Sequence, residues 1–144
     1  MTNQTTIILT TDGASLNNQN ENNREAAIGY LIEQDDEVVA EESKYLGQGS
    51  KYTNNFAEYQ AVTTGVREIK KQFGGERINL HIKSDSQLLI KQLAGEYSVN
   101  NMKNQYNECV EELSSVDSWQ PEHVSQSPGN RVDRADKLAA KAFD

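Results

Sequence analysis

The sequence predicts an α/β domain in which helices flank a five-stranded mixed β-sheet. Segments rich in β-forming residues predict strands, and a long segment with apolar residues four, three and four positions apart predicts a helix. The expected order is three strands, a helix, a strand, two helices, a strand and a helix. Neighbouring strands followed by strands that alternate with helices are typical of a sheet with both antiparallel and parallel pairs.

The first three strands are expected at residues 5–11, 26–33 and 37–46. The first of them is β-rich and should end near Asp12. A short polar link, residues 34–36, joins the second strand to the third, which predicts an antiparallel hairpin. The Asn- and Gln-rich residues 17–23 are interpreted as a polar loop.

A long helix is expected to begin at Asn54 or Asn55, either of which can serve as its N-cap, and to run to about Phe73 before Gly74 and Gly75. The remaining elements are a strand at 78–83 that finishes at Ser84-Asp85, helices at 88–94 and 101–115, a strand at 119–124 and an Ala-rich final helix.

The composition indicates one domain, residues 1–144, with its own hydrophobic core. Hydrophobic residues make up 35% and charged residues 25% of the chain, which differs from the composition of a disordered protein. The single cysteine, Cys109, has no partner for an internal disulfide, suits a reducing cytoplasm and is expected to be buried. The N-terminus has neither a basic leader nor a long apolar run. We therefore expect a cytoplasmic monomer that does not enter membranes.

The net charge of −8, from 14 Lys and Arg against 22 Asp and Glu, is unusual for a protein that binds nucleic acid. A chain of this charge that did bind nucleic acid would do so weakly, through metal ions, or in high salt. Two interpretations remain open: an ordinary solvated acidic surface, or adaptation to a salty, halophilic cytoplasm.

Glu58 is the first candidate for a functional residue. The apolar stripe of the long helix consists of Val62, Val66, Ile69 and Phe73, and one turn back along it lies Glu58. A carboxylate on a buried stripe costs on the order of several kcal/mol unless a cation or hydrogen bonds compensate it. Alternatively, Glu58 lies exposed in the first turn, where the helix dipole favours an acid.

Further acids occur at the ends of predicted elements. Asp12 and Asp85 each follow a strand, and ligand sites in α/β sheets gather at the carboxyl ends of strands. Taken singly, Asp12 could form a turn and Asp85 could cap a helix. Asp133 or Asp136 supplies a fourth acid at the last helix. Together these oxygens suit Mg²⁺ or Mn²⁺, whereas the lone cysteine and the two histidines lack a zinc-ligand spacing.

Four motifs resemble those of the ribonuclease H type 1 family, in the family's order. They are Thr11-Asp12-Gly13-Ala14-Ser15, Thr53-Asn54-Asn55-Phe56-Ala57-Glu58-Tyr59-Gln60-Ala61, Ser84-Asp85-Ser86-Gln87-Leu88-Leu89-Ile90 and Ala135-Asp136-Lys137-Leu138-Ala139. Residues 92–97 are similar to the compact archaeal and bacterial branch, which lacks the basic protrusion of longer bacterial enzymes.

The resemblance implies a ribonuclease H-like fold and an endoribonuclease that cuts the RNA strand of RNA–DNA hybrids, leaving 5′-phosphate and 3′-hydroxyl ends. By that similarity Asp12, Glu58, Asp85 and Asp136 would hold two divalent cations, Mg²⁺ or Mn²⁺, at the scissile phosphate. Counting back from the Ala-Asp-Lys-Leu-Ala motif favours Asp136 as the fourth acid, and counting forward from the last strand favours Asp133. We choose Asp136.

The resemblance also implies that Asn54, Asn55 and Gln87 contact the minor groove of the hybrid. Amide side chains can both donate to and accept from the 2′-hydroxyl groups that mark RNA. The alternatives are helix capping for the two asparagines and a solvated helix face for Gln87.

Two features depart from the family pattern. Residues 16–25 form a longer, Asn-rich loop, and residues 125–130 lack the histidine that some members place there.

Competing functions fit less well. A 3′–5′ exonuclease of related fold would carry Asp-x-Glu, but Ala14 stands at that position. Transposase and integrase cores share the chemistry, but the chain is short and has no evident DNA-binding module. A catalytically silent hybrid-binding module would lack at least one of the acids.

Overall fold

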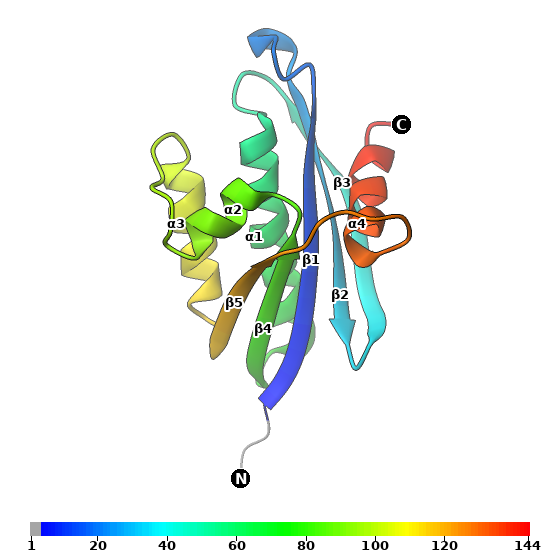
Figure 1. Cartoon of the computed structure of the whole chain (residues 1–144), viewed down its shortest axis with the longest axis vertical. Coiled ribbons are helices and arrows are strands. Elements are labelled where there is room, and N and C mark those ends of the chain that lie inside the picture. The colour runs from blue at the N-terminus through cyan, green and yellow to red at the C-terminus, as the bar shows by residue number, and fades with distance from the viewer. Residues whose placement is uncertain (1–3) are drawn as a thin grey trace.

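The sheet has five strands in the order β3-β2-β1-β4-β5, as Figure 1 shows. In this computed structural model, which describes residues 4–144, the strands are β1 (Gln4–Leu16), β2 (Glu25–Gln34), β3 (Glu37–Gln48), β4 (Arg77–Ser84) and β5 (Ser118–His123). The helices are α1 (Asn54–Phe73), α2 (Gln87–Leu93), α3 (Lys103–Leu113) and α4 (Arg131–Lys141), with a short 3₁₀ turn at Glu21–Asn23. The pairs β1–β2 and β2–β3 are antiparallel and the pairs β1–β4 and β4–β5 are parallel, which confirms the predicted mixed sheet.

The predicted hairpin between β2 and β3 is present. Asp35 and Asp36 occupy the turn with φ angles of 54° and 66°. Two consecutive residues with positive φ are the requirement of a type I′ turn, and Asp tolerates that conformation better than most residues.

The prediction that β1 ends near Asp12 is wrong. The strand continues to Leu16 because β2 supplies an antiparallel partner from Ile8 to Leu16, so that Asp12 lies opposite Gly29. On its other side, the parallel pairing with β4 stops at Thr10. Asp12 therefore lies inside a strand, just past the point where the neighbouring parallel strand has ended. The predicted long loop correspondingly shrinks to residues 17–24.

The N-cap of α1 is Thr53 and not one of the two asparagines. The Thr53 hydroxyl accepts a hydrogen bond from the Phe56 amide at 3.1 Å. A threonine one residue earlier thus satisfies a free helix N–H, and Asn54 and Asn55 fall in the first helical turn. The capping interpretation of these two residues is therefore wrong.

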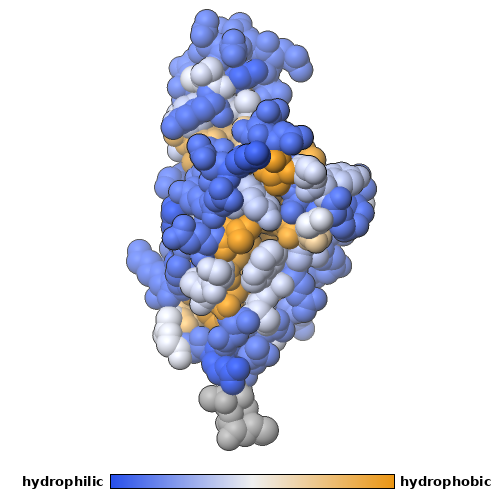
Figure 2. Space-filling view, turned by 90° about the vertical axis from the view of Figure 1, so that its left-hand side faces the viewer, coloured by the Kyte–Doolittle hydropathy of each residue, from blue (hydrophilic) through white to orange (hydrophobic). Residues whose placement is uncertain are grey.

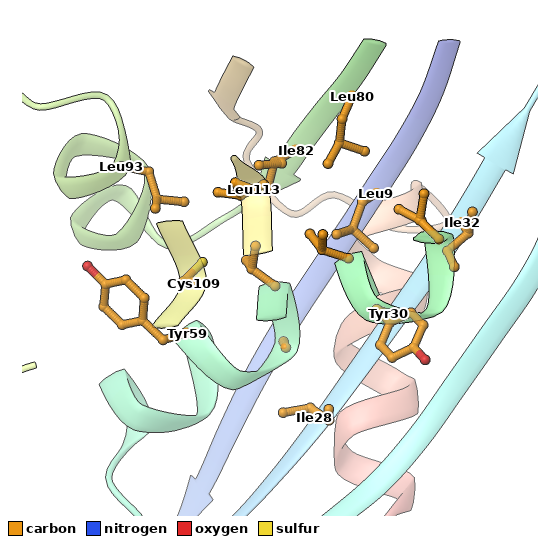
Figure 3. Close-up of a cluster of buried hydrophobic side chains, with 14 of the residues drawn as sticks. Leu9, Ile28, Tyr30, Ile32, Tyr59, Leu80, Ile82, Leu93, Cys109 and Leu113 are labelled. Carbon is orange, nitrogen blue, oxygen red and sulfur yellow. The ribbon is translucent and has the colours of Figure 1, made fainter. Parts of the chain in front are cut away.

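Helices pack on both faces of the sheet (Figure 1). Helix α1 lies on the face to which Leu9 points, and the predicted stripe residues Val62, Val66 and Ile69 are fully buried there. Figure 3 shows part of this core, in which Cys109 lies beside Tyr59 and Leu113; the predicted burial of the cysteine is confirmed. The core holds α1 against the strand that carries Asp12.

Helix α4 packs on the opposite face at Gly29 of β2. A Cβ atom at this position would overlap the backbone carbonyl oxygen of Ala135 and lie 2.6 Å from the backbone nitrogen of Ala139. The absence of a side chain at Gly29 therefore lets α4 lie directly on the sheet.

Gly29→Ala is expected to destabilise the fold by about 1–3 kcal/mol, because backbone atoms of α4 cannot move aside as a side chain can. Gly65→Ala is the matched control: its new methyl group would meet the flexible end of Leu9, and alanine favours the helix that contains Gly65. Urea unfolding of both variants measures the difference. If Gly29→Ala proved as stable as Gly65→Ala, the proposed close contact of α4 with β2 would be wrong.

The surface is mainly hydrophilic on the face shown in Figure 2, with a narrow band of apolar residues across it. Within residues 4–144, every helix is too short or too polar to cross a lipid bilayer.

Candidate active site

Three carboxylates from separate parts of the chain converge at one end of the sheet. Asp12 comes from β1, Glu58 from the first turns of α1, and Asp85 follows β4 directly. One oxygen from each lies within 4.8 Å of the others. Asp12 and Glu58 are only 6% and 4% exposed, so the cluster is largely shielded from water.

Gly13 sets the close approach between β1 and α1. A Cβ atom on Gly13 would collide with the backbone of Ala57 and Glu58. Because Gly13 has no Cβ atom, the two backbones approach closely and the Gly13 N–H donates a hydrogen bond to the Glu58 carboxylate. Asp12 and Glu58 are therefore brought together by the backbone of the residue that follows Asp12.

Hydroxyl groups organise the chain around Asp85. The Ser84 hydroxyl accepts from the Ser86 amide at 3.0 Å, and the Ser86 hydroxyl caps α2 by accepting from the Leu89 amide at 3.2 Å. The His123 ring at the end of β5 lies 3.2 Å from the backbone carbonyl of Asp85. Asp85 is thus held between the start of α2 and the last residue of β5.

The structure separates the two candidates for the fourth acid. Asp136 lines the same cleft as Asp12, Glu58 and Asp85, and its charge is one of the causes of the raised pKa of Asp12. Asp133 instead is held mainly by groups of α4 and the preceding loop, one of which, Gln126, also donates to Asp136 at 3.4 Å. Asp133 accepts from Gln126 at 3.0 Å and from the Gly129 amide at 3.1 Å, and it pairs with Lys137 at 3.1 Å.

The pKa values reflect these two environments. Hydrogen bonds from Gln126 and Gly129, followed by Lys137, lower the pKa of Asp133 to about 2. Asp133 is therefore a satisfied carboxylate that holds the loop before α4, whereas Asp136 borders the cleft that contains the other acids.

The converging acids repel each other strongly. Burial, followed by the charges of Glu58, Asp85 and Asp136, raises the pKa of Asp12 to about 9. Burial raises the pKa of Glu58 to about 7, although hydrogen bonds from Gly13 and Ser86 favour its charged form. Burial and then Asp136 also raise the pKa of Asp85. Without a cation, these carboxylates cannot all be charged at neutral pH.

This donor set fits a hard divalent cation. Carboxylate oxygens are the protein ligands that Mg²⁺ and Mn²⁺ prefer, and the cation's charge would reverse the repulsion that raises the pKa values. The cleft has a volume of about 370 Å³ and is bordered by the acids together with Ser15, Asn54 and Ser86. Its size leaves room for ions and for part of a polar substrate.

A second, polar groove of about 460 Å³ begins beside the acidic cleft, and Asn54 borders both. We call it the amide groove; it is lined by Asn18, Arg24, Thr53, Asn54, Asn55, Asn101 and Met102. Two of the three predicted substrate-binding residues, Asn54 and Asn55, thus lie in the grooves. Gln87 is exposed at the start of α2 and lines neither of them.

Several residues of the two grooves were missed from the sequence. Asn18 and Arg24 lie within residues 16–25, which were predicted only as an Asn-rich loop, and Asn101 precedes α3 by two residues. No role at the site was predicted for His123, although its ring contacts the backbone of Asp85. The asparagine enrichment of residues 17–23 was the only available signal, because grooves form between segments that are distant in sequence.

The fold is a mixed five-stranded sheet, and acids from β1, α1, the end of β4 and α4 lie at one end of it. This arrangement defines the ribonuclease H-like fold class. Comparison with known proteins supports this assignment of the fold class. A family model described as "Reverse transcriptase-like" matches residues 10–142. Ribonuclease HI of Halobacterium salinarum is 35% identical over 136 residues, which cover 92% of this chain and 62% of the relative. The chain therefore spans somewhat less than two thirds of that relative's length.

Two solved structures are similar over nearly their whole length. RNase H1 from the halophilic archaeon Halobacterium salinarum has 32% sequence identity and a TM-score of 0.80, with 96% of this chain and 98% of the other covered. LC11-RNase H1, isolated from compost, has 26% identity and a TM-score of 0.78, with 98% and 97% covered. The chain belongs to the ribonuclease H family, type 1.

The chain shares the compact form expected from the sequence. Only residues 94–102 connect α2 to α3, and they contain no Lys or Arg.

Proposed function

We propose that this protein is an endoribonuclease that hydrolyses the RNA strand of RNA–DNA hybrids and leaves 5′-phosphate and 3′-hydroxyl ends. The observation that carries the proposal is the cluster of Asp12, Glu58 and Asp85 within 4.8 Å, with Asp136 on the same cleft, in a chain of the ribonuclease H family. LC11-RNase H1, which shares the fold, has been solved in complex with an RNA/DNA hybrid.

We further propose that Asp12, Glu58, Asp85 and Asp136 hold two divalent cations, Mg²⁺ or Mn²⁺. When bound there, such ions would supply Lewis-acid chemistry, lowering the pKa of an attacking water molecule and stabilising the leaving oxygen of a phosphodiester. The protein's part is to fix the oxygens. The Gly13 N–H orients Glu58, and the short path from β4 into α2 orients Asp85. Burial of Asp12 and Glu58 keeps competing water away from their oxygens.

The amide groups beside the acids suit recognition of RNA. Asn54 and Asn55 present side chains that can donate to and accept from a 2′-hydroxyl, and the groove that they line continues from the acidic cleft. Gln87 is next to Ser86, which borders the acidic cleft, so it would contact a hybrid that extends beyond that cleft.

Cleavage of a labelled hybrid tests the proposal. We expect cutting of the RNA strand with millimolar Mg²⁺ or Mn²⁺, no cutting in EDTA, and no comparable cutting of double-stranded RNA or double-stranded DNA. Binding of the hybrid without cleavage under all these conditions would instead favour the catalytically silent binding module. Such a module is expected to lack at least one of the four acids, and all four are present.

The choice between the two acids of α4 gives a separate prediction. Asp136→Asn is expected to reduce the cleavage rate about a hundredfold or more, because it removes a charge that faces the cations. Asp133→Asn should leave the rate nearly unchanged and lower Tm by about 2–4 °C, since it weakens the contacts with Gly129 and Lys137. Cleavage rates and melting curves of both variants test this choice. A large loss of rate in Asp133→Asn with a nearly unchanged rate in Asp136→Asn would make Asp133 the ligand.

We also propose that residues 1–144 act as one domain, as a monomer, in the cytoplasm. The buried thiol of Cys109 is consistent with a reducing compartment. Sedimentation at the mass of a single chain is the expected result.

Adaptation to salt is a further proposal. The net charge of −8 and the similarity to a protein from a halophile support it. We expect the fold and hybrid cleavage to persist in molar KCl, because counterions screen repulsion among surface acids. Circular dichroism and cleavage rates across a KCl series measure this. Loss of both in molar KCl would remove the salt proposal and leave the nuclease proposal intact.

A further inference from the structure

A buried chain of two hydrogen bonds links α1 to the loop between α2 and α3. The Tyr59 hydroxyl donates to the Gln92 side-chain oxygen at 2.5 Å. The Gln92 amide nitrogen in turn donates to the backbone carbonyl of Ser98 at 3.1 Å. Tyr59 is 1% and Gln92 8% exposed, so water competes little for these bonds.

The loop held in this way, residues 94–102, leads to one wall of the amide groove. Its first part is fixed to α2, because the amides of Glu96 and Tyr97 both donate to the Lys91 carbonyl. Ser98 is the next anchored residue, and it precedes by a few residues Asn101 and Met102, which line the groove. The bond from Gln92 is therefore the last side-chain anchor of the loop, within the described residues, before the chain reaches the groove.

Tyr59 points away from the acids although it follows Glu58 in sequence. Successive residues of an α-helix project about 100° apart, since there are 3.6 residues per turn. The Tyr59 ring packs edge-to-face on Tyr106 of α3, with centroids 6.3 Å apart, and Figure 3 shows it beside Cys109 and Leu93. Its hydroxyl can thus act on the loop without touching the acidic cleft.

We infer that Tyr59 and Gln92 are positioning residues that set the wall of the amide groove and thereby the affinity for the hybrid. This inference rests on the proposed function, because it takes the groove to hold part of the nucleic acid. The pair holds Asn101 and Met102 in place before the substrate binds. Binding then does not cost the free energy of ordering the loop, so the affinity is higher.

Removal of the bonds should change KM and spare kcat. For Tyr59→Phe and Gln92→Leu we expect KM to rise about three- to tenfold, the range that corresponds to the loss of one buried hydrogen bond, with kcat nearly constant. Gln92→Glu keeps the acceptor for Tyr59 and loses the donor to Ser98, so its KM should also rise. Tyr106→Phe is the matched control, because no hydrogen bond of its hydroxyl occurs among the described residues, and its KM should stay at the wild-type value.

Hydrogen exchange gives a readout that does not depend on activity. The backbone amides of residues 98–102 should exchange faster in Tyr59→Phe and not in Tyr106→Phe. A lower Tm with unchanged KM would show that the pair is merely structural and would overturn the inference. A lower kcat with unchanged KM would also overturn it, because the pair would then act through Glu58.

Failure of the proposed function is distinguishable from failure of this inference. If the wild-type protein cuts no hybrid, the nuclease proposal fails. The affinity for the hybrid can still be compared by fluorescence anisotropy in Asp85→Asn with and without Tyr59→Phe. A Kd that is equal in the two variants would contradict the positioning role.

Discussion

Asp85→Asn is expected to reduce hybrid cleavage about a thousandfold or more while the protein stays folded. Asparagine has nearly the shape of aspartate but not its charge, and bound cations contribute several kcal/mol to stabilising the transition state, with about 1.4 kcal/mol for each factor of ten. Asp85 is only half-buried, and the hydrogen bonds of Ser84 and Ser86 that shape its surroundings do not involve its carboxylate. Asp12→Asn should have the same effect on cleavage.

Single-turnover cleavage with saturating Mg²⁺ measures the effect, and circular dichroism checks the fold. Glu111→Gln, which removes an exposed carboxylate from α3, is a control for the change in net charge and should cut at the wild-type rate. Full activity in either Asp12→Asn or Asp85→Asn would rule out the metal-dependent mechanism.

The second large effect concerns the stability of the metal-free protein. The pKa of Asp12 is raised from 3.8 to about 9 by burial and by the charges of Glu58, Asp85 and Asp136. The folded protein therefore binds this proton more tightly than the unfolded chain does. The stability contributed by the proton is complete below about pH 4 and is lost as the pH rises toward about 9.

In EDTA, the Tm of the wild-type protein is accordingly expected to fall between about pH 5 and about pH 9 by roughly 10 °C, which corresponds to a few kcal/mol for a domain of this size. Asp12→Asn carries no charge at this position at any pH. It should show a flatter profile and a higher Tm than the wild-type protein at pH 8. Mg²⁺ should raise the Tm of the wild-type protein and have a smaller effect on the variant.

Melting curves in EDTA and in Mg²⁺ across this pH range measure both effects. Glu111→Gln is again the control and should follow the wild-type profile. Superimposable profiles for the wild-type protein and Asp12→Asn would mean that the acids do not repel one another in the folded state.

Glu58 illustrates what the sequence could predict about the site. The helix periodicity placed it on a buried stripe, and its burial in the structure follows directly from that spacing. The order of the elements along the chain and the mixed sheet also followed from local patterns, because alternation and turn residues are properties of short segments. The exact end of β1 did not, because it depends on pairing with β2, which is a contact between distant segments.

Other details depended on specific geometry. The different surroundings of Asp133 and Asp136 depend on the hydrogen bond from Gly129 and the ion pair with Lys137, which no spacing rule contains. The amide groove draws residues from the β1–β2 connection, the start of α1 and the start of α3. Its polar residues resemble ordinary loop residues until the fold brings them together.

Crystals soaked in Mn²⁺ and examined by anomalous diffraction would test the central claim most directly, namely that four acids form a cage for divalent cations. We expect two anomalous peaks about 4 Å apart, each contacted by oxygens of Asp12, Glu58, Asp85 or Asp136. A Mn²⁺ ion bound at Asp133 in place of Asp136, or no peak at the cluster at saturating Mn²⁺, would contradict the claim.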